Sequence, residues 1–297
     1  MLNKTLPYLL LLLIVIIPAC EVYKQDDYVE QYVVEAFITA GETLPEVRLS
    51  RTIPLSQTYV FEAVAISGAD IVIRLTGENG SPAAEYTYTE SSLRGVYIPD
   101  DRDSRILSGR AYTLEVTGLD RPEDRITAST IVPQQFEIVS LNVGETVYQS
   151  DIQFEFKLTR SFFPGRQNIF VASSTALDPN NFPLTPFWAD RDGKPEEYIQ
   201  VSSGLINEGN YTVNDDDTID LRYPWIGIAY YGPNRLTIYA VDDNIFDYYR
   251  SLQTQQGGGG TISPGQIENV LWNVEGGIGL FGARAGVSAD VVVNSGF

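Results

Sequence analysis

Apolar residues recur at every second position over short stretches of this chain, and this period constrains the fold more than any other feature. Residues 69–76, for example, place Ile71, Ile73 and Leu75 on one side of an extended strand. Similar runs occupy residues 29–40, 111–117, 152–158 and 287–293. Glycine, proline or asparagine interrupts such runs about every ten residues. The pattern predicts a mainly β protein built from antiparallel, sandwich-like modules.

The strand pattern divides near Pro133, and a length of 297 residues favours two modules. We expect residues 29–132 to form an N-terminal immunoglobulin- or transthyretin-like β-sandwich. Residues 133–297 are then a C-terminal β-rich domain.

One stretch of the C-terminal domain has helical rather than strand periodicity. Its apolar residues lie three or four positions apart: Ile245, Tyr249 and Leu252. Asp242 or Asp243 can cap the first turn, and Gly257 can end the last one. The spacing predicts one short α-helix near 243–256.

Three segments of the first module resemble the transthyretin-like and carboxypeptidase-regulatory-like sandwich families. They are Gly68-Ala69-Asp70-Ile71, Gly95-Val96-Tyr97 and Tyr112-Thr113-Leu114-Glu115-Val116. Tyr97 and Tyr112 can bury their rings while the hydroxyls stay near a sheet edge. The resemblance implies a fold and says nothing of function.

The N-terminus reads as a signal for export. Lys4 precedes an unbroken aliphatic run from Leu9 to Ile17, which is too short for a transmembrane helix. The following Pro18-Ala19-Cys20 resembles a bacterial lipobox, in which the cysteine is lipidated. We therefore expect residues 1–19 to be a lipoprotein signal peptide, Cys20 to carry the lipid, and residues 20–28 to form an acidic tether.

The composition excludes several kinds of chemistry. The chain has no histidine, and Cys20 is its only cysteine, so Ser-His-Asp and Cys-His mechanisms and imidazole-bound metals are excluded. A net charge of −19 makes nucleic acid an improbable partner. The acidic run at 214–217 lacks the ligand spacing of a calcium loop and predicts a hairpin turn. We expect no metal and no cofactor.

Aromatic residues of the second module are the leading candidates for a binding surface. They lie in or beside loops rich in proline and glycine: Phe187, Trp188, Trp225, Tyr230 and Tyr231, with Phe182 and Tyr223 nearby. Exposed tryptophan and tyrosine present flat faces to ligands or partner proteins. The alternative is that they fill a small satellite core beneath a long loop. Full burial of both Trp188 and Trp225 would exclude the binding interpretation.

The C-terminal segment 276–283 is rich in glycine, and we expect it to pack closely rather than face a ligand. Together with 247–252 (DYYRSL) and Asn273, it resembles the signature of a Bacteroidetes lipoprotein family called domain of unknown function 4249. The N-terminal segments 33–36 and 47–52 agree with that family.

The resemblance implies context rather than an activity. Such lipoproteins look like partners of TonB-dependent outer-membrane transporters. The resulting hypothesis is a non-enzymatic accessory protein, lipid-anchored in the outer membrane, that binds a ligand or partner. The alternatives are a structural or adhesion lipoprotein, or a glycoside hydrolase with two carboxylates across a cleft.

Overall fold

The computed structural model describes residues 28–54, 56–77, 79–121, 123–256 and 270–296. The fold is mainly β, as the alternation predicted. The first half contains β1 (Tyr32–Thr39), β2 (Val47–Arg51), α2 (Phe61–Val64), β3 (Asp70–Thr76), β4 (Pro82–Glu90), β5 (Val96–Pro99), β6 (Ala111–Thr117) and β7 (Ile126–Ile131). The strands of the second half are β8 (Ile138–Leu141), β9 (Glu145–Val147), β10 (Glu155–Thr159), β11 (Ile169–Ala176), β12 (Gln200–Ile206), β13 (Tyr211–Val213), β14 (Thr218–Arg222), β15 (Gly232–Val241), β16 (Val274–Glu275) and β17 (Ile278–Asn294). Its helices are α3 (Pro186–Ala189) and α4 (Asp243–Gln256), with 3-10 turns η1 (Pro195–Tyr198), η2 (Glu208–Asn210) and η3 (Trp225–Gly227).

The first module is a sheet that closes on itself. Its strand order is β17-β1-β2-β5-β4-β3-β6-β7, and β16 pairs with β7 on the side away from β6. The two ends of this path, β17 and β7, lie next to each other. Ile71, Ile73 and Leu75 of β3 all point into the enclosed core.

The second module is a sandwich of two sheets. One has the order β12-β11-β15-β17, with β9 also pairing β17, and the other has the order β13-β14-β10-β8. Phe154, Phe156 and Phe170 are fully buried between them. The apolar cores of the two modules form a single continuous cluster.

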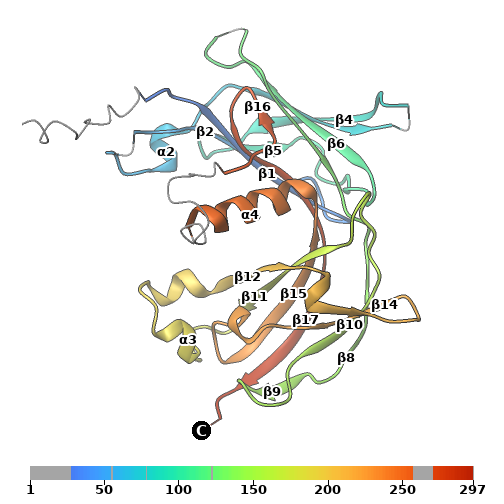
Figure 1. The fold of residues 1–297 in the computed structure, drawn as a ribbon. Helices are drawn as coiled ribbons and strands as arrows, with labels where there is room; N and C mark the ends of the chain where they lie inside the picture. The colour runs from blue at the N-terminus through green and yellow to red at the C-terminus, as the bar shows by residue number, and fades with distance from the viewer. Residues whose placement is uncertain (1–27, 55, 78, 122, 257–269, 297) are drawn as a thin grey trace, which may run out of the picture.

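Strand β17 belongs to both modules. Figure 1 shows it running the length of the molecule. Its first residues, 278–284, pair with β1, and its remaining residues, 284–293, pair with β15. The buried Val291 and Val293, which would be an aggregation hazard if exposed, lie inside the second module.

Two details differ from the predicted pair of antiparallel modules. β17 pairs in parallel with both β1 and β9. Pairing also crosses the predicted boundary at 133, because β16 and the start of β17 complete the first module. The alternation of apolar residues sets which face of a strand is buried but not which strand it pairs with. A parallel pair leaves no turn signal in the sequence.

The predicted helix at 243–256 is confirmed as α4, with Asp242 as its N-cap. The Oδ1 of Asp242 accepts a hydrogen bond from the backbone N–H of Ile245 at 2.9 Å. The helix packs on β17 where that strand has small residues, and Ile245 lies against Gly282. Two one-turn helices, α2 and α3, were not predicted, because single turns carry no periodicity.

Candidate functional site

The predicted aromatic residues divide into two groups in the structure. Phe187, Trp188 and Tyr230 belong to a small cluster around α3 and η1. Trp225 and Tyr231 pack instead against the main core. The five residues therefore do not form one continuous binding surface.

Residues 177–199 form an ordered excursion between β11 and β12. Three backbone hydrogen bonds attach it to the strand β15 and the turn before it: Leu177 N–H to Pro233, Thr185 N–H to Ala229, and Tyr231 N–H to Pro183. The Thr185 hydroxyl, fully buried, donates to the carbonyl of Ile228 at 2.9 Å. This fixed support holds α3 in one position.

An aromatic and cationic surface lies at α3, and we call it the α3 surface. It consists of Phe187 and Trp188 of the helix, Arg191 just after it and Ile226 of η3. The Arg191 guanidinium lies 4.4 Å from the ring centre of Phe187 and 4.8 Å from that of Trp188. Trp188 is half-buried, and its indole N–H donates to the carbonyl of Ile226 at 3.0 Å. Ile226 itself is 49% exposed. A rigid aromatic face with a stacked cation is suited to binding a partner.

Tyr230 and Tyr198 pack beneath the α3 surface, on its side toward the protein interior. The Tyr230 hydroxyl donates to the carbonyl of Pro195 at 2.6 Å, and the ring is buried. Tyr198 lies with its ring centre 5.0 Å from that of Trp188. Tyr230 is therefore a structural residue, contrary to its prediction as a contact residue, because its ring faces inward.

Trp225 and Tyr231 are packed by core aromatics. The ring of Tyr148 meets Trp225 at 5.5 Å and Tyr231 at 5.8 Å, both edge to face. Phe154 lies on Trp225 as well, at 6.1 Å. Both side chains are half-buried. Their rings therefore pack on the main core, which fits a structural role better than a binding one. The separate small cluster beneath the long loop is the one that contains Tyr230 and contacts Trp188.

Sequence reasoning missed Arg191 and Ile226. Arg191 follows Trp188 by three positions, and a turn after α3 brings the two together through the hydrogen bond from the Arg191 N–H to the Trp188 carbonyl. Ile226 is brought to Trp188 by η3, and nothing in the sequence links these positions.

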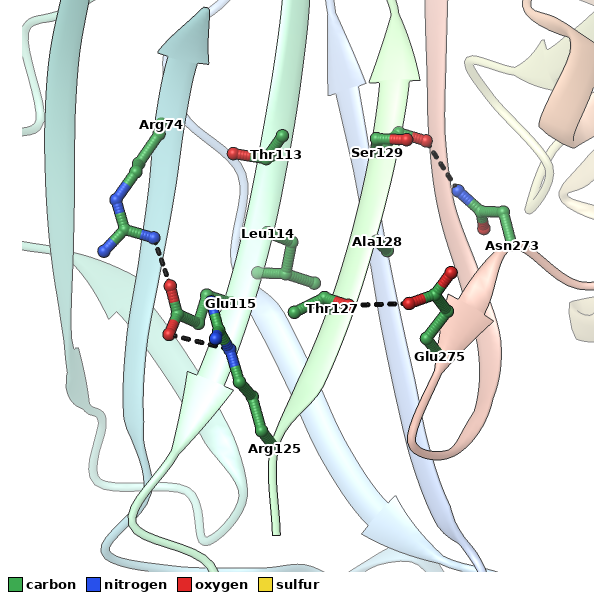
Figure 2. A pocket seen from close by; sticks show the side chains of 10 residues that line it. All are labelled: Arg74, Thr113, Leu114, Glu115, Arg125, Thr127, Ala128, Ser129, Asn273 and Glu275. Atoms are coloured by element: carbon green, nitrogen blue, oxygen red, sulfur yellow. Dashed lines mark hydrogen bonds and ion pairs between the residues drawn. The ribbon is translucent and has the colours of Figure 1, made fainter. Parts of the chain in front are cut away.

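A polar groove of about 360 Å³ lies on the outer face of the first module, across β3, β6, β7 and β16. Figure 2 shows Arg74 and Arg125 paired with Glu115, and Glu275 bonded to Thr127. The Glu115 carboxylate accepts a hydrogen bond from Arg74 and forms an ion pair with Arg125 at 3.0 Å. Glu275 lies across the groove, beside Thr127. Both carboxylate oxygens of Glu115 are thus engaged by guanidinium groups.

The glycine-rich C-terminal segment is a packing element, as expected. A side chain on Gly276 would meet the carbonyl of Arg125 at 2.1 Å, and one on Gly277 would meet the carbonyl of Tyr32 at 2.7 Å. The turn therefore bridges β7 and β1 at contact distances that only glycine permits.

Side chains close the gap between β7 and β17, which we call the seam. The Asn273 amide donates to the carbonyls of Ser129 and Phe281 at 2.9 and 2.8 Å and accepts from the Phe281 N–H at 3.0 Å. Asn244, on the first turn of α4, donates to the same two carbonyls. The amides thus replace the backbone pairing that is missing at this point of the sheet.

Asp242 completes the seam from inside. The Thr130 hydroxyl of β7 donates to its carboxylate. Burial raises the pKa of the Asp242 carboxyl to about 6, although the hydrogen bonds from Thr130 and Ile245 act in the opposite direction. With 1% of its surface exposed, this group is part of the fold and is closed to ligands.

The acidic run at 214–217 is the hairpin turn between β13 and β14, as predicted. Asp217 takes the left-handed conformation and pairs with Arg160 at 2.6 Å. A hydrogen bond from the Thr218 hydroxyl lowers the pKa of Asp216, and Lys157 adds to this effect. Across the described ranges, no group of three or more acidic or cysteine side chains is placed to hold a metal ion.

Cys20 and the signal segment lie outside the described residues. Within the part of the chain that the structure describes, no helix is both long and apolar enough to span a membrane. The lipid anchor therefore stays a prediction.

A family model described as "Domain of unknown function (DUF4249)" matches residues 21–288. No curated protein matches. Among solved structures, the chain is similar to trypsin-activated alpha-2-macroglobulin from Escherichia coli, at 11% identity, over 72% of this chain and 14% of that one, with a TM-score of 0.22. It is also similar to a tetra-tandem repeat in the extending region of a large adhesion protein, at 13% identity, over 90% of this chain and 50% of that one, with a TM-score of 0.25. The chain thus spans half or less of each of these two structures.

Proposed function

We propose, from the premise that this chain belongs to the family described as domain of unknown function (DUF4249), that it is a lipid-anchored, non-enzymatic protein of the cell envelope that binds a partner protein. The α3 surface is the observation that carries this function. It joins two aromatic rings, a stacked arginine and an exposed isoleucine on a fixed support.

The residue types of the α3 surface are those that dominate protein interfaces. Tryptophan and arginine are enriched among residues that contribute most to binding, and aromatic rings lose little conformational entropy on association. Arg191 is held over Phe187 and Trp188 before any partner arrives. A prearranged contact of this kind lowers the entropic cost of binding.

A TonB-dependent outer-membrane transporter is the partner we propose. This choice follows from the family resemblance of the C-terminal segment and from the lipobox-like ending at Cys20. The protein would then be anchored in the outer membrane through the lipid and would contact the transporter through the α3 surface.

A non-enzymatic role is supported by the state of the polar groups. The carboxylate at the centre of the outer groove, Glu115, is paired with Arg74 and Arg125. Asp242 has a raised pKa, as catalytic acids often do. Its side chain is, however, buried in the seam, where a substrate cannot reach it. The hydrolase alternative therefore has less support than partner binding.

We expect the double variant Phe187→Ser/Ile226→Ser to lose the partner. Purification of the native protein from outer membranes in mild detergent should recover the transporter, and the variant should recover at least about tenfold less, because removing an interface anchor costs about 2 kcal/mol. Val139→Ser is the matched control, since Val139 is 52% exposed on β8. Equal recovery with the double variant and the control would exclude the α3 surface, and absence of any transporter would favour a structural role.

A second expectation concerns the anchor. Cys20→Ser should abolish incorporation of a labelled fatty acid, because the chain has no other thiol. Metabolic labelling followed by immunoprecipitation measures this directly. Failure of the unchanged chain to incorporate label would contradict the lipoprotein prediction.

A further inference from the structure

Exposed apolar side chains gather at the end of the molecule where the described chain begins. We call this the N-terminal patch: Tyr28, Val29, Tyr59, Val60 and Leu93. Their exposed fractions run from 44% for Tyr28 to 74% for Val29. Tyr28 also lines a hollow of about 480 Å³, together with residues of the segment that leads into α2 and with Arg51 and Arg94. Figure 1 shows α2 beside the start of the described chain, with α3 in the other half of the molecule.

Hydrogen bonds and close packing fix the segments that carry the patch residues. The Tyr28 hydroxyl bonds to Thr52, and the Tyr59 hydroxyl lies 3.3 Å from that of Ser50. The turn that carries Leu93 is fixed by Gly95, whose left-handed backbone packs on Ala65. Three segments distant in sequence are therefore all anchored on or beside β2.

The length of chain before the patch limits what can face it. Eight peptide links separate Cys20 from Tyr28, and fully extended they reach at most about 28 Å. A compact chain of this size has a radius of gyration of roughly 18 Å, so its diameter exceeds that reach. A lipid on Cys20 therefore keeps this end of the molecule near the bilayer.

Arginine and acidic side chains both lie around the patch. Arg48 stacks on the Phe61 ring at 4.2 Å, Arg94 lines the hollow, and Arg51 pairs with Glu30. These arginines offset part of the charge of the acidic neighbours Glu30, Glu35, Glu62, Glu90 and Asp120. The five side chains of the patch are themselves uncharged, so their contact with lipid does not require a carboxylate to leave water.

We propose that the N-terminal patch is a membrane-contact surface, inserting Tyr59, Val60 and Leu93 into the lipid interface beside the anchor. Tyrosine is favoured at this depth, and apolar side chains bind there by burying area. The proposal rests on the lipid anchor at Cys20 proposed above. Its consequence is a fixed orientation of the first module relative to the bilayer.

The test uses the full-length lipoprotein with one added cysteine, either Val60→Cys or Leu93→Cys, labelled with an environment-sensitive fluorophore. Mixed with vesicles of phosphatidylethanolamine and phosphatidylglycerol, each label should brighten about twofold or more on leaving water, and brominated lipid should quench it. Val139→Cys is the control, because Val139 is equally exposed on β8 in the other module. Its label should not change.

Flotation of the same samples separates the two proposals. Protein that floats with the vesicles while the labels at 60 and 93 behave like that at 139 is anchored but makes no patch contact, which overturns the inference alone. Protein that does not float, with labels unchanged, contradicts the anchor and the patch together. Selective brightening at 60 and 93 in floating protein supports both.

Discussion

Replacing Gly279 with alanine should lower the free energy of unfolding by about 3 kcal/mol or more, because it combines a forbidden backbone conformation with a steric clash. Gly279 has a φ of +124°, and a Cβ there would meet the carbonyl oxygen of Val34 at 2.0 Å. Both atoms belong to the parallel pairing of β1 and β17, where neither strand can shift without breaking register.

Urea unfolding of the Gly279→Ala variant measures this loss. Gly144→Ala is the matched control, because a side chain there would meet nothing within 4 Å. Since β17 belongs to both modules, the two modules of the Gly279→Ala variant should unfold together in one transition. Equal midpoints for the two variants would show that the pairing of β1 with β17 contributes little.

Asp242→Asn should change how stability depends on pH. The folded protein holds a proton on Asp242 up to about pH 6, whereas the ordinary pKa is 3.8. Between these values the folded state binds more protons than the unfolded state, so stability from this group is present below pH 3.8 and is lost as the pH rises to 6. Relative to Asp242→Asn, the unchanged protein should lose about 3 kcal/mol over this window.

Measuring free energies of unfolding for both proteins from pH 4 to pH 8 tests this difference. Asparagine keeps the N-cap acceptor, so the comparison isolates ionisation. Asp243→Asn controls for the loss of one negative charge, since the Asp243 side chain is exposed and pairs with Arg166. Parallel curves for the unchanged protein and Asp242→Asn would show that the buried carboxyl does not titrate in this range.

Local structure was predictable wherever a signal is carried by neighbouring residues. The helix α4 follows from the spacing of Ile245, Tyr249 and Leu252 and from the capping aspartate, and all of these act within a few residues. The buried face of β3 follows in the same way from strict alternation. The tight packing of the glycine-rich segment was also predictable, because repeated glycines indicate close backbone approach.

Long-range pairing was not predictable, for a physical reason. The pairing of Val33 with Ile278 joins two strands that no tight turn connects. The sequence of neither strand therefore indicates which strand it pairs with. The role of Asn273 was not predictable either, because its hydrogen bond to Ser129 forms only once the sheet has closed. The candidate site shares this property: the Trp188 indole meets Ile226 through two separate loops, and only their packing distinguishes Trp188 from the core residue Trp225.

The sharing of β17 between modules affects the order in which the protein can fold. As the chain is synthesised, β1 emerges early, but its parallel neighbour emerges only after more than two hundred further residues. The first module therefore cannot complete its hydrogen bonding while synthesis is in progress, and a nascent chain leaves that edge of β1 open. Contacts so distant in sequence favour slow folding of the finished chain over stepwise folding of each module.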